Sequence, residues 1–278
     1  MDLLLSAQAE QNIWADVAIL GTGGAVLAVW LVTHRGPARL RQAPPRPHRL
    51  PPVTPLALIG AWMLFNLGLF ALLEGFVDPP GRRIFLQYLA LDIGYALFCG
   101  MMLILAQRSF VHGLTGFGIR WRTLGRDLVW AFVNLLAAWP LIYLAVAAVV
   151  FFGQQVGGDE FQFEQNTGLV DIQQSVQMPP HVLAAVLVFT LLLVPLFEEI
   201  LFRGLLQSAI RNLTGSPWSA IFLTSIPFAL LHPLTHLPAL LVLSICLGYA
   251  YERSGSLLRS IFIHVLFNAI NVGVTLTS

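Results

Sequence analysis

Residues 181–210 read HVLAAVLVFTLLLVPLFEEILFRGLLQSAI, and this stretch decides the class of the fold. It contains no Asp, Glu, Lys or Arg before position 198, so its apolar part approaches the roughly 20 residues that a helix needs to cross a bilayer. Glu198, Glu199 and Arg203 then interrupt it, although each charge at that depth costs about 2.5 to 3.5 kcal/mol on insertion scales. The stretch predicts a membrane helix whose charges require an explanation.

Apolar stretches of this kind make up most of the chain. Of its 278 residues 57% are hydrophobic and only 10% are charged, whereas a soluble domain carries about a quarter charged residues. We therefore expect an all-α, polytopic integral membrane protein with about eight transmembrane helices. The apolar runs lie near 13–33, 54–75, 84–106, 128–152, 181–210, 217–232, 237–251 and 258–276. The last three are short, so each is a full span, a tilted span or a re-entrant piece.

The arginines are unevenly distributed between the joints that connect these runs. Twelve of them lie in every second joint, beginning with the joints 34–53 and 107–127. Of the intervening joints, one has Arg82 and Arg83, and the acidic joint 153–180 has none. Because cytoplasmic loops carry an excess of Arg and Lys, we expect joints 34–53 and 107–127 to be cytoplasmic and both termini to lie outside the cytoplasm. The Pro- and Arg-rich stretch 35–52 is either a contact to lipid headgroups or a solvated linker. The twelve are Arg35, Arg39, Arg41, Arg46, Arg49, Arg108, Arg120, Arg122, Arg126, Arg211, Arg253 and Arg259.

The basic residues are all arginine, and the formal net charge is only +1. A nearly neutral chain gives no indication of a nucleic-acid partner. A composition rich in Arg, Ala and Leu is compatible with a high-GC bacterial genome, and we therefore expect the protein in a bacterial inner (cell) membrane.

Helix geometry separates the roles of the charges in the run 181–210. Residues four apart are neighbours on a helix, and Glu before Arg is the favourable order, so Glu199 is expected to pair with Arg203. Glu198 is about 100° away around the helix and points elsewhere. Such an unpaired carboxylate can serve as a general base or acid. A purely structural cluster of ion pairs between helices is the alternative.

Two histidines lie on later apolar runs. His232 ends the sixth run, and His264 lies in the eighth with Asn268 and Asn271 on the same helical face. Polar groups in a membrane helix face other protein or a water-filled cavity. We therefore expect one cavity walled by the segments of Glu198, His232 and His264, with a base to activate water and donors for an oxyanion.

Three further features have open interpretations. Asp92, in the middle of an apolar run, is a candidate functional residue or an acceptor for a hydrogen bond from a neighbouring helix. The acidic joint 153–180, with Phe161 and Phe163, is a lid, a partner surface or a simple connector. His236 follows His232 by four residues, but Pro233 lies between them, so we expect a loop residue.

Three motifs together resemble one known family. Glu-Glu-x-x-x-Arg at 198–203, Phe-x-x-x-His at 228–232 and His-x-x-x-Asn at 264–268 are similar to the motifs of the CAAX prenyl protease and bacteriocin-processing (CPBP, or Abi) family of intramembrane endopeptidases. The segment Gly248 to Ser256 also looks like the family's lead-in to its last motif. The resemblance covers about 181–275. It implies a division into residues 1–128, membrane helices without a recognised motif, and 129–278, a catalytic helical core.

The resemblance also implies roles for individual residues. Glu198 and His232 would activate a water molecule, His264 and Asn268 would stabilise the oxyanion, and Glu199 and Arg203 would support the site. Glu198, His232 and His264 could alternatively hold a catalytic zinc with an open fourth position. We favour a mechanism without a bound metal, because Asn268 near His264 suits an oxyanion donor and the sequence indicates no carboxylate behind the imidazoles.

The resulting prediction is an intramembrane endopeptidase that cleaves a membrane-associated protein or peptide with a lipidated or hydrophobic tail. The bilayer and such a substrate are the expected partners. The alternative is a non-catalytic protein, either a transporter of solutes or protons or an immunity component, that uses the same polar cavity. Transport predicts that Asp92 and Glu198 both matter, whereas proteolysis predicts dependence on Glu198, His232, His264 and Asn268.

Overall fold

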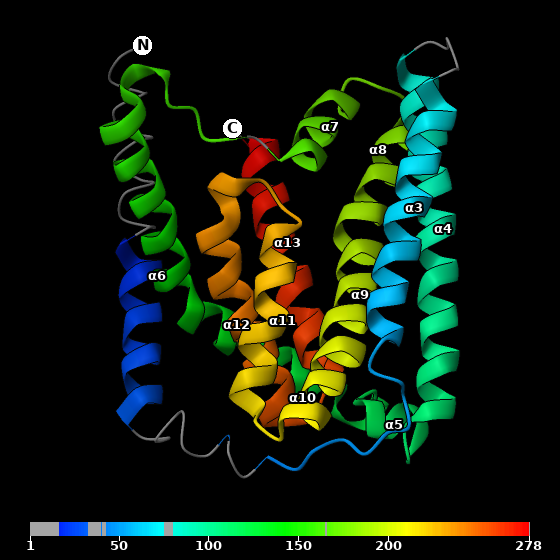
Figure 1. The fold of residues 1–278 in the computed structure, drawn as a ribbon. Helices are drawn as coiled ribbons and strands as arrows, with labels where there is room; N and C mark the ends of the chain where they lie inside the picture. Colours follow the sequence, from blue (N-terminus) through cyan, green and yellow to red (C-terminus); the bar gives the residue numbers. More distant parts are fainter. Residues whose placement is uncertain (1–16, 33–39, 41–42, 75–79, 165, 278) are drawn as a thin grey trace.

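The computed structural model describes residues 17–32, 40, 43–74, 80–164 and 166–277 (Figure 1). Arg35, Arg39 and Arg41 of the basic joint, and the outer ends of the first two apolar runs, lie outside the described residues. The described chain is helical, and its one β pairing is an isolated antiparallel bridge between His48 and Phe110. The predicted all-α class is confirmed.

Long helices follow each other in alternating directions across the molecule (Figure 1). The first described helix is Val17–Val32. Then follow α3 (Thr54–Glu74), α4 (Pro80–Ser109), α6 (Leu124–Gly157), a composite helix over 180–214, α11 (Pro217–Leu230), α12 (Leu237–Ser254) and α13 (Leu257–Thr277). Short helices connect them: α5 (Gly113–Phe117) and α7 (Thr167–Ser175), with 3-10 turns at Trp121–Thr123, Gly158–Glu160 and Leu234–His236.

The predicted count of about eight spans is not confirmed. Six described helices are long and apolar enough to cross a membrane, and the chain is an integral membrane protein. Val17–Val32 and α11 are shorter apolar helices. The 14 residues of α11 extend only about 21 Å, against a hydrocarbon core of about 30 Å. Both ends of α11 follow from the sequence. The Ser216 hydroxyl accepts a hydrogen bond from the Ser219 N–H and caps the start of the helix, and Pro233 follows its end.

The composite helix occupies the centre of the fold. It consists of α8 (Pro180–Val188), the π-helical segment η3 (Phe189–Leu193), α9 (Val194–Glu198), the π-helical segment η4 (Glu199–Gln207) and α10 (Ser208–Thr214). Its apolar side chains join α4 and α13 in one buried core, while α6 and α12 form a second core beside it. The charges of 198–203 are thereby surrounded by protein on several sides.

The second half of the Pro- and Arg-rich joint is anchored to the protein by Arg46. Arg46 is only 8% exposed, its Nη1 lies 3.3 Å from Glu252 Oε1, and its Nη2 donates to the Tyr251 carbonyl at 2.6 Å. The guanidinium also covers the Tyr251 ring, 3.6 Å from its centroid. Arg211 donates to the Ala43 carbonyl at 3.2 Å. Within residues 43–50, Arg46 and Leu50 are buried, whereas Pro44, Pro45, Pro47 and Arg49 are exposed, so this part of the joint is anchored at two side chains and solvated between them.

Gly204 allows a close approach between two elements at this same end. A Cβ at this position would overlap the ring of Phe117, the last residue of α5. Both residues are fully buried. The small residue after Arg203 thus lets α5 dock under the composite helix.

Candidate active site

Pro195 lies one turn before the two adjacent carboxylates and disturbs the helix that carries them. A proline has no N–H, and its ring clashes with the carbonyl of the preceding turn. The backbone is π-helical immediately before it, over Phe189–Leu193, and again over Glu199–Gln207. Such wide turns are frequent at functional sites. Here they flank the short α-helical piece Val194–Glu198 that delivers Glu198 to a cavity.

Glu199 is buried and fully partnered. Its Oε1 accepts from Arg203 Nη1 at 2.8 Å and from His264 Nδ1 at 3.0 Å, and its Oε2 accepts from Ser260 Oγ. Arg203 in turn donates from Nη2 to Ser244 Oγ at 2.7 Å. Both charged side chains are 0% exposed. The predicted Glu199–Arg203 pair is confirmed, and it links the composite helix to α12 and α13.

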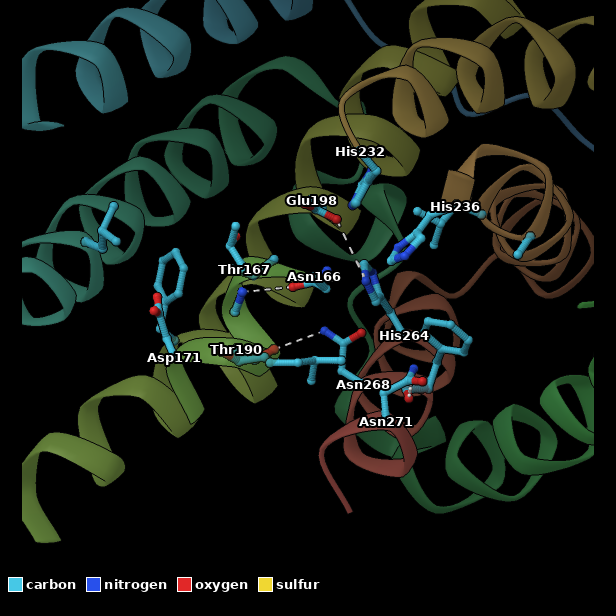
Figure 2. Close-up of a pocket in the computed structure, with 18 of the residues that line it drawn as sticks. Asn166, Thr167, Asp171, Thr190, Glu198, His232, His236, His264, Asn268 and Asn271 are labelled. Atoms are coloured by element: carbon cyan, nitrogen blue, oxygen red, sulfur yellow. Dashed lines mark hydrogen bonds and ion pairs between the residues drawn. The ribbon is translucent and has the colours of Figure 1, made fainter. Parts of the chain in front are cut away.

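Glu198 points away from this cluster, as helix geometry predicted. Its side chain is 13% exposed, and its Oε2 lies 3.8 Å from His264 Nε2 without a hydrogen-bond partner (Figure 2). Since the Glu199 carboxylate accepts from Nδ1 of His264, the hydrogen of the neutral ring is on Nδ1. Nε2 of His264 then faces Glu198 as an acceptor, and it becomes a donor only when the ring is protonated.

His232 lies just past the end of α11 and turns toward the same space (Figure 2). Its Nδ1 is 2.9 Å from the Phe228 carbonyl, which can only accept, so Nδ1 carries the hydrogen and Nε2 is free to accept. The buried Phe228 ring packs against both imidazoles, at centroid distances of 5.3 Å to His232 and 5.9 Å to His264. It also lies under the Arg203 guanidinium at 4.2 Å, so this one side chain fixes the relative position of three site residues.

Asn268 lines the cavity one turn beyond His264, on α13. Its Nδ2 donates to the Thr190 carbonyl of the composite helix at 3.0 Å (Figure 2). Asn271 also lines the cavity, but its Nδ2 donates to Phe267 of its own helix at 2.9 Å. The polar face predicted for this helix is therefore present, and only one of its two amides is tied to another element.

The cavity that joins these groups measures about 710 Å³. The predicted walls are present, from α9 with Glu198, from the turn after α11 with His232 and from α13 with His264, but α3, α4, α6, α7 and α12 contribute as well. The sequence did not identify Tyr88, whose hydroxyl donates to Asp171 of α7 at 2.6 Å, as a lining residue. Asp171 belongs to the acidic joint 153–180. The acidic and aromatic residues of this joint are the only sequence feature that could have indicated a contribution to the cavity.

His236 lies in the turn between α11 and α12, where a loop residue was expected, and it lines the same cavity. Its Nε2 is 2.8 Å from the Glu164 carbonyl, and its ring stacks on Phe163 at 4.7 Å. Thr235 Oγ1 donates to Glu164 Oε2 at 3.3 Å. The joint 153–180 is thus docked on the turn that follows His232 and covers one end of the cavity.

The donor types in the cavity suit a metal, but their placement does not. In the part of the chain that the structure describes, no three His, Cys, Asp or Glu side chains are grouped to hold a metal ion. One argument used against zinc was wrong, however: Glu199 is a carboxylate directly behind the His264 imidazole, as in many metal sites. Because the possible ligands are not grouped around one point, the reaction proposed below does not involve a metal.

The comparison with known families agrees with the three motifs. Residues 180–270 match the family model of the Type II CAAX prenyl endopeptidase Rce1-like proteins, and the match spans Glu198, His232, His264 and Asn268. Neither a curated protein nor a solved structure matches the chain. The predicted resemblance is confirmed for this third of the chain, and a membrane protease family implies membrane-associated peptide substrates.

Proposed function

We propose that this protein is an intramembrane endopeptidase that cleaves membrane-associated proteins or peptides near a hydrophobic or lipidated tail. The observation that carries the proposal is the unpartnered Glu198 carboxylate, which faces His264 Nε2 at 3.8 Å in a cavity within a helical membrane protein. Both oxygens of the Glu199 carboxylate behind it accept hydrogen bonds, so Glu198 is the carboxylate left to react.

In the proposed reaction, a water molecule donates its two hydrogens to the Glu198 carboxylate and to His232 Nε2. Its oxygen attacks the scissile carbonyl carbon while Glu198 takes one proton, and the carbonyl π electrons move to the oxygen. That proton passes to His264 Nε2, which then donates to the oxyanion together with the Asn268 amide. When the C–N bond breaks, the oxyanion electrons re-form the carbonyl, and His264 returns the proton to Glu198, which delivers it to the leaving amine.

The cavity wall supports an apolar substrate segment. Its aromatic side chains come from α3, α4, α6, α13, the composite helix and the joint 153–180, and they are Phe70, Tyr88, Tyr95, Trp139, Tyr143, Phe163, Phe189 and Phe267. An aromatic surface inside a membrane protein suits a hydrophobic tail that leaves the bilayer for the site. Asp92, the residue on which a transport function would depend, is not part of this lining in the described chain.

The proposal is tested by comparing the termini of membrane and secreted proteins in cells that express wild type, Glu198→Gln or Asp92→Asn at equal levels. We expect one or a few proteins to keep an intact hydrophobic or lipidated tail in Glu198→Gln cells and to be processed normally in Asp92→Asn cells. Unchanged termini in both, with a growth defect in both, would contradict proteolysis and support transport.

The orientation in the membrane forms part of the proposal. The described basic joints lie at the α5 end, whereas α7 and the turn between α11 and α12 lie at the opposite end (Figure 1). If the basic end is cytoplasmic, the active site is closer to the outer face. A membrane-impermeant maleimide on intact cells should label Val156→Cys, which is 90% exposed, and not Trp121→Cys, which is 75% exposed. The opposite labelling would reverse the orientation.

A further inference from the structure

The wide turn before Pro195 leaves one backbone carbonyl without a partner in its own helix. In the π-helical segment Phe189–Leu193, the Val194 N–H donates to the Phe189 carbonyl, five residues back. The Thr190 carbonyl would next pair with the N–H of residue 195, but that residue is proline. A carbonyl inside a membrane protein needs a donor, because an unsatisfied one costs free energy comparable to a lost hydrogen bond.

The donor comes from the proposed oxyanion residue. Asn268 Nδ2 lies 3.0 Å from the Thr190 carbonyl, across from α13 to the composite helix. An amide nitrogen has two hydrogens, so this bond uses one of them and leaves the second for another acceptor. Because the amide is planar, fixing one N–H also fixes the direction of the other. The neighbouring Asn271 has no such anchor to another element, since its amide donates to its own helix.

We propose that Pro195 is a positioning residue that acts through Asn268. By withholding an N–H, it keeps the Thr190 carbonyl available as a fixed acceptor, and this acceptor orients the Asn268 amide toward the oxyanion. The inference rests on the proposed function of Asn268. It assigns to the sequence Val194–Pro195, just ahead of the carboxylates, a task beyond bending the helix.

The link from Pro195 through the Thr190 carbonyl to Asn268 is tested without measuring activity, by thermal unfolding of the full-length protein in detergent micelles. Asn268→Leu leaves the Thr190 carbonyl without a donor and should lower the Tm. Pro195→Ala gives the Thr190 carbonyl a donor from its own helix, which is the N–H of residue 195 in a π-helical register or the N–H of Val194 in an α-helical register. The same Asn268→Leu change should therefore lower the Tm clearly less in that background. Asn271→Leu is the matched control, and its effect should be equal in both backgrounds.

The catalytic consequence is tested with the protein whose terminus shifts in the Glu198→Gln comparison, purified and used as the probe substrate. Pro195→Ala should reduce kcat by about 10- to 100-fold with little change in KM, because a small misplacement of a catalytic group can cost about 10²-fold. In an Asn268→Ala background, Pro195→Ala should have no further effect. Thr190→Ser, which keeps the carbonyl, should cleave like wild type.

The outcomes separate this inference from the proposed function. Additive Tm losses from Pro195→Ala and Asn268→Leu would overturn the link, whatever the activity. A kcat loss from Pro195→Ala that persists in the Asn268→Ala background would also overturn it, because the proline would then act through the position of Glu198. If no probe substrate is found because wild type and Glu198→Gln cells have the same termini, the proposed function fails, and the Tm measurements still decide the link.

Discussion

The two adjacent carboxylates should respond to the same substitution in opposite ways. Glu199→Gln removes the charge that pairs with Arg203 at 2.8 Å, where both side chains are 0% exposed. Breaking a buried ion pair by removing one partner costs about 3 to 5 kcal/mol, because the other charge is left uncompensated. At about 2 to 4 °C of Tm per kcal/mol, the expected loss in Tm is about 6 to 20 °C.

Glu198→Gln should leave the fold almost unchanged. Its side chain is 13% exposed, its Oε2 has no hydrogen-bond partner, and its neighbour His264 has Nε2 3.8 Å away. We expect a change in the free energy of unfolding below about 1 kcal/mol, since no buried pair is broken. Cleavage should fall by about 10²- to 10⁴-fold, the usual contribution of a general base.

Thermal melts in detergent, followed by the fluorescence of the 7 tryptophans, measure both variants under one condition. The control is the double variant Glu199→Met with Arg203→Met, which removes both charges and should regain most of the Tm lost in Glu199→Gln. Equal Tm losses for Glu198→Gln and Glu199→Gln would refute the division of roles. A Glu199→Gln protein as stable as wild type would refute the cost assigned to the buried pair.

Three further outcomes are expected. Gly204→Ala should destabilise the protein by about 1 to 3 kcal/mol in chemical unfolding, because a Cβ would overlap the Phe117 ring, and Phe117→Leu should restore part of the loss. Arg46→Met should make residues 43–50 at least about tenfold more sensitive to an added protease, because hydrogen bonds of a charged group to Glu252 and a carbonyl, worth about 1.5 to 3 kcal/mol, are lost. Cleavage should survive treatment with a zinc chelator, and stoichiometric zinc whose removal abolishes cleavage would contradict the proposed mechanism.

The parts of the site that depend on one helix could be predicted from the sequence. Glu199 and Arg203 are four residues apart, and this spacing remains a contact even in a π-helical segment. The same is true of the face that carries His264 and Asn268. The wide turns were missed because the prediction assumed a regular period of 3.6 residues, although Pro195 indicated where a regular helix would fail.

The parts that depend on tertiary docking could not be predicted. His236 and Asp171 line the cavity because the joint 153–180 folds back over it, and nothing in the local sequence determines that path. The packing of Arg46 against Glu252 joins residues 206 positions apart. The division into residues 1–128 and 129–278, and the roles assigned to the individual catalytic residues, stay predictions.

Glu198 differs from the other three proposed catalytic side chains in its hydrogen bonding, and this difference favours the role of a base for it. His264 is held by Glu199, His232 by a carbonyl of its own helix, and Asn268 by a carbonyl of the neighbouring helix. Each bond fixes the direction of the opposite, cavity-facing atom. Glu198 differs from these three side chains because its Oε2 has no hydrogen-bond partner, so it can reorient between a water molecule and a leaving amine. Donors for an oxyanion must be fixed before charge develops, whereas a base must accept a proton at one atom and release it at another.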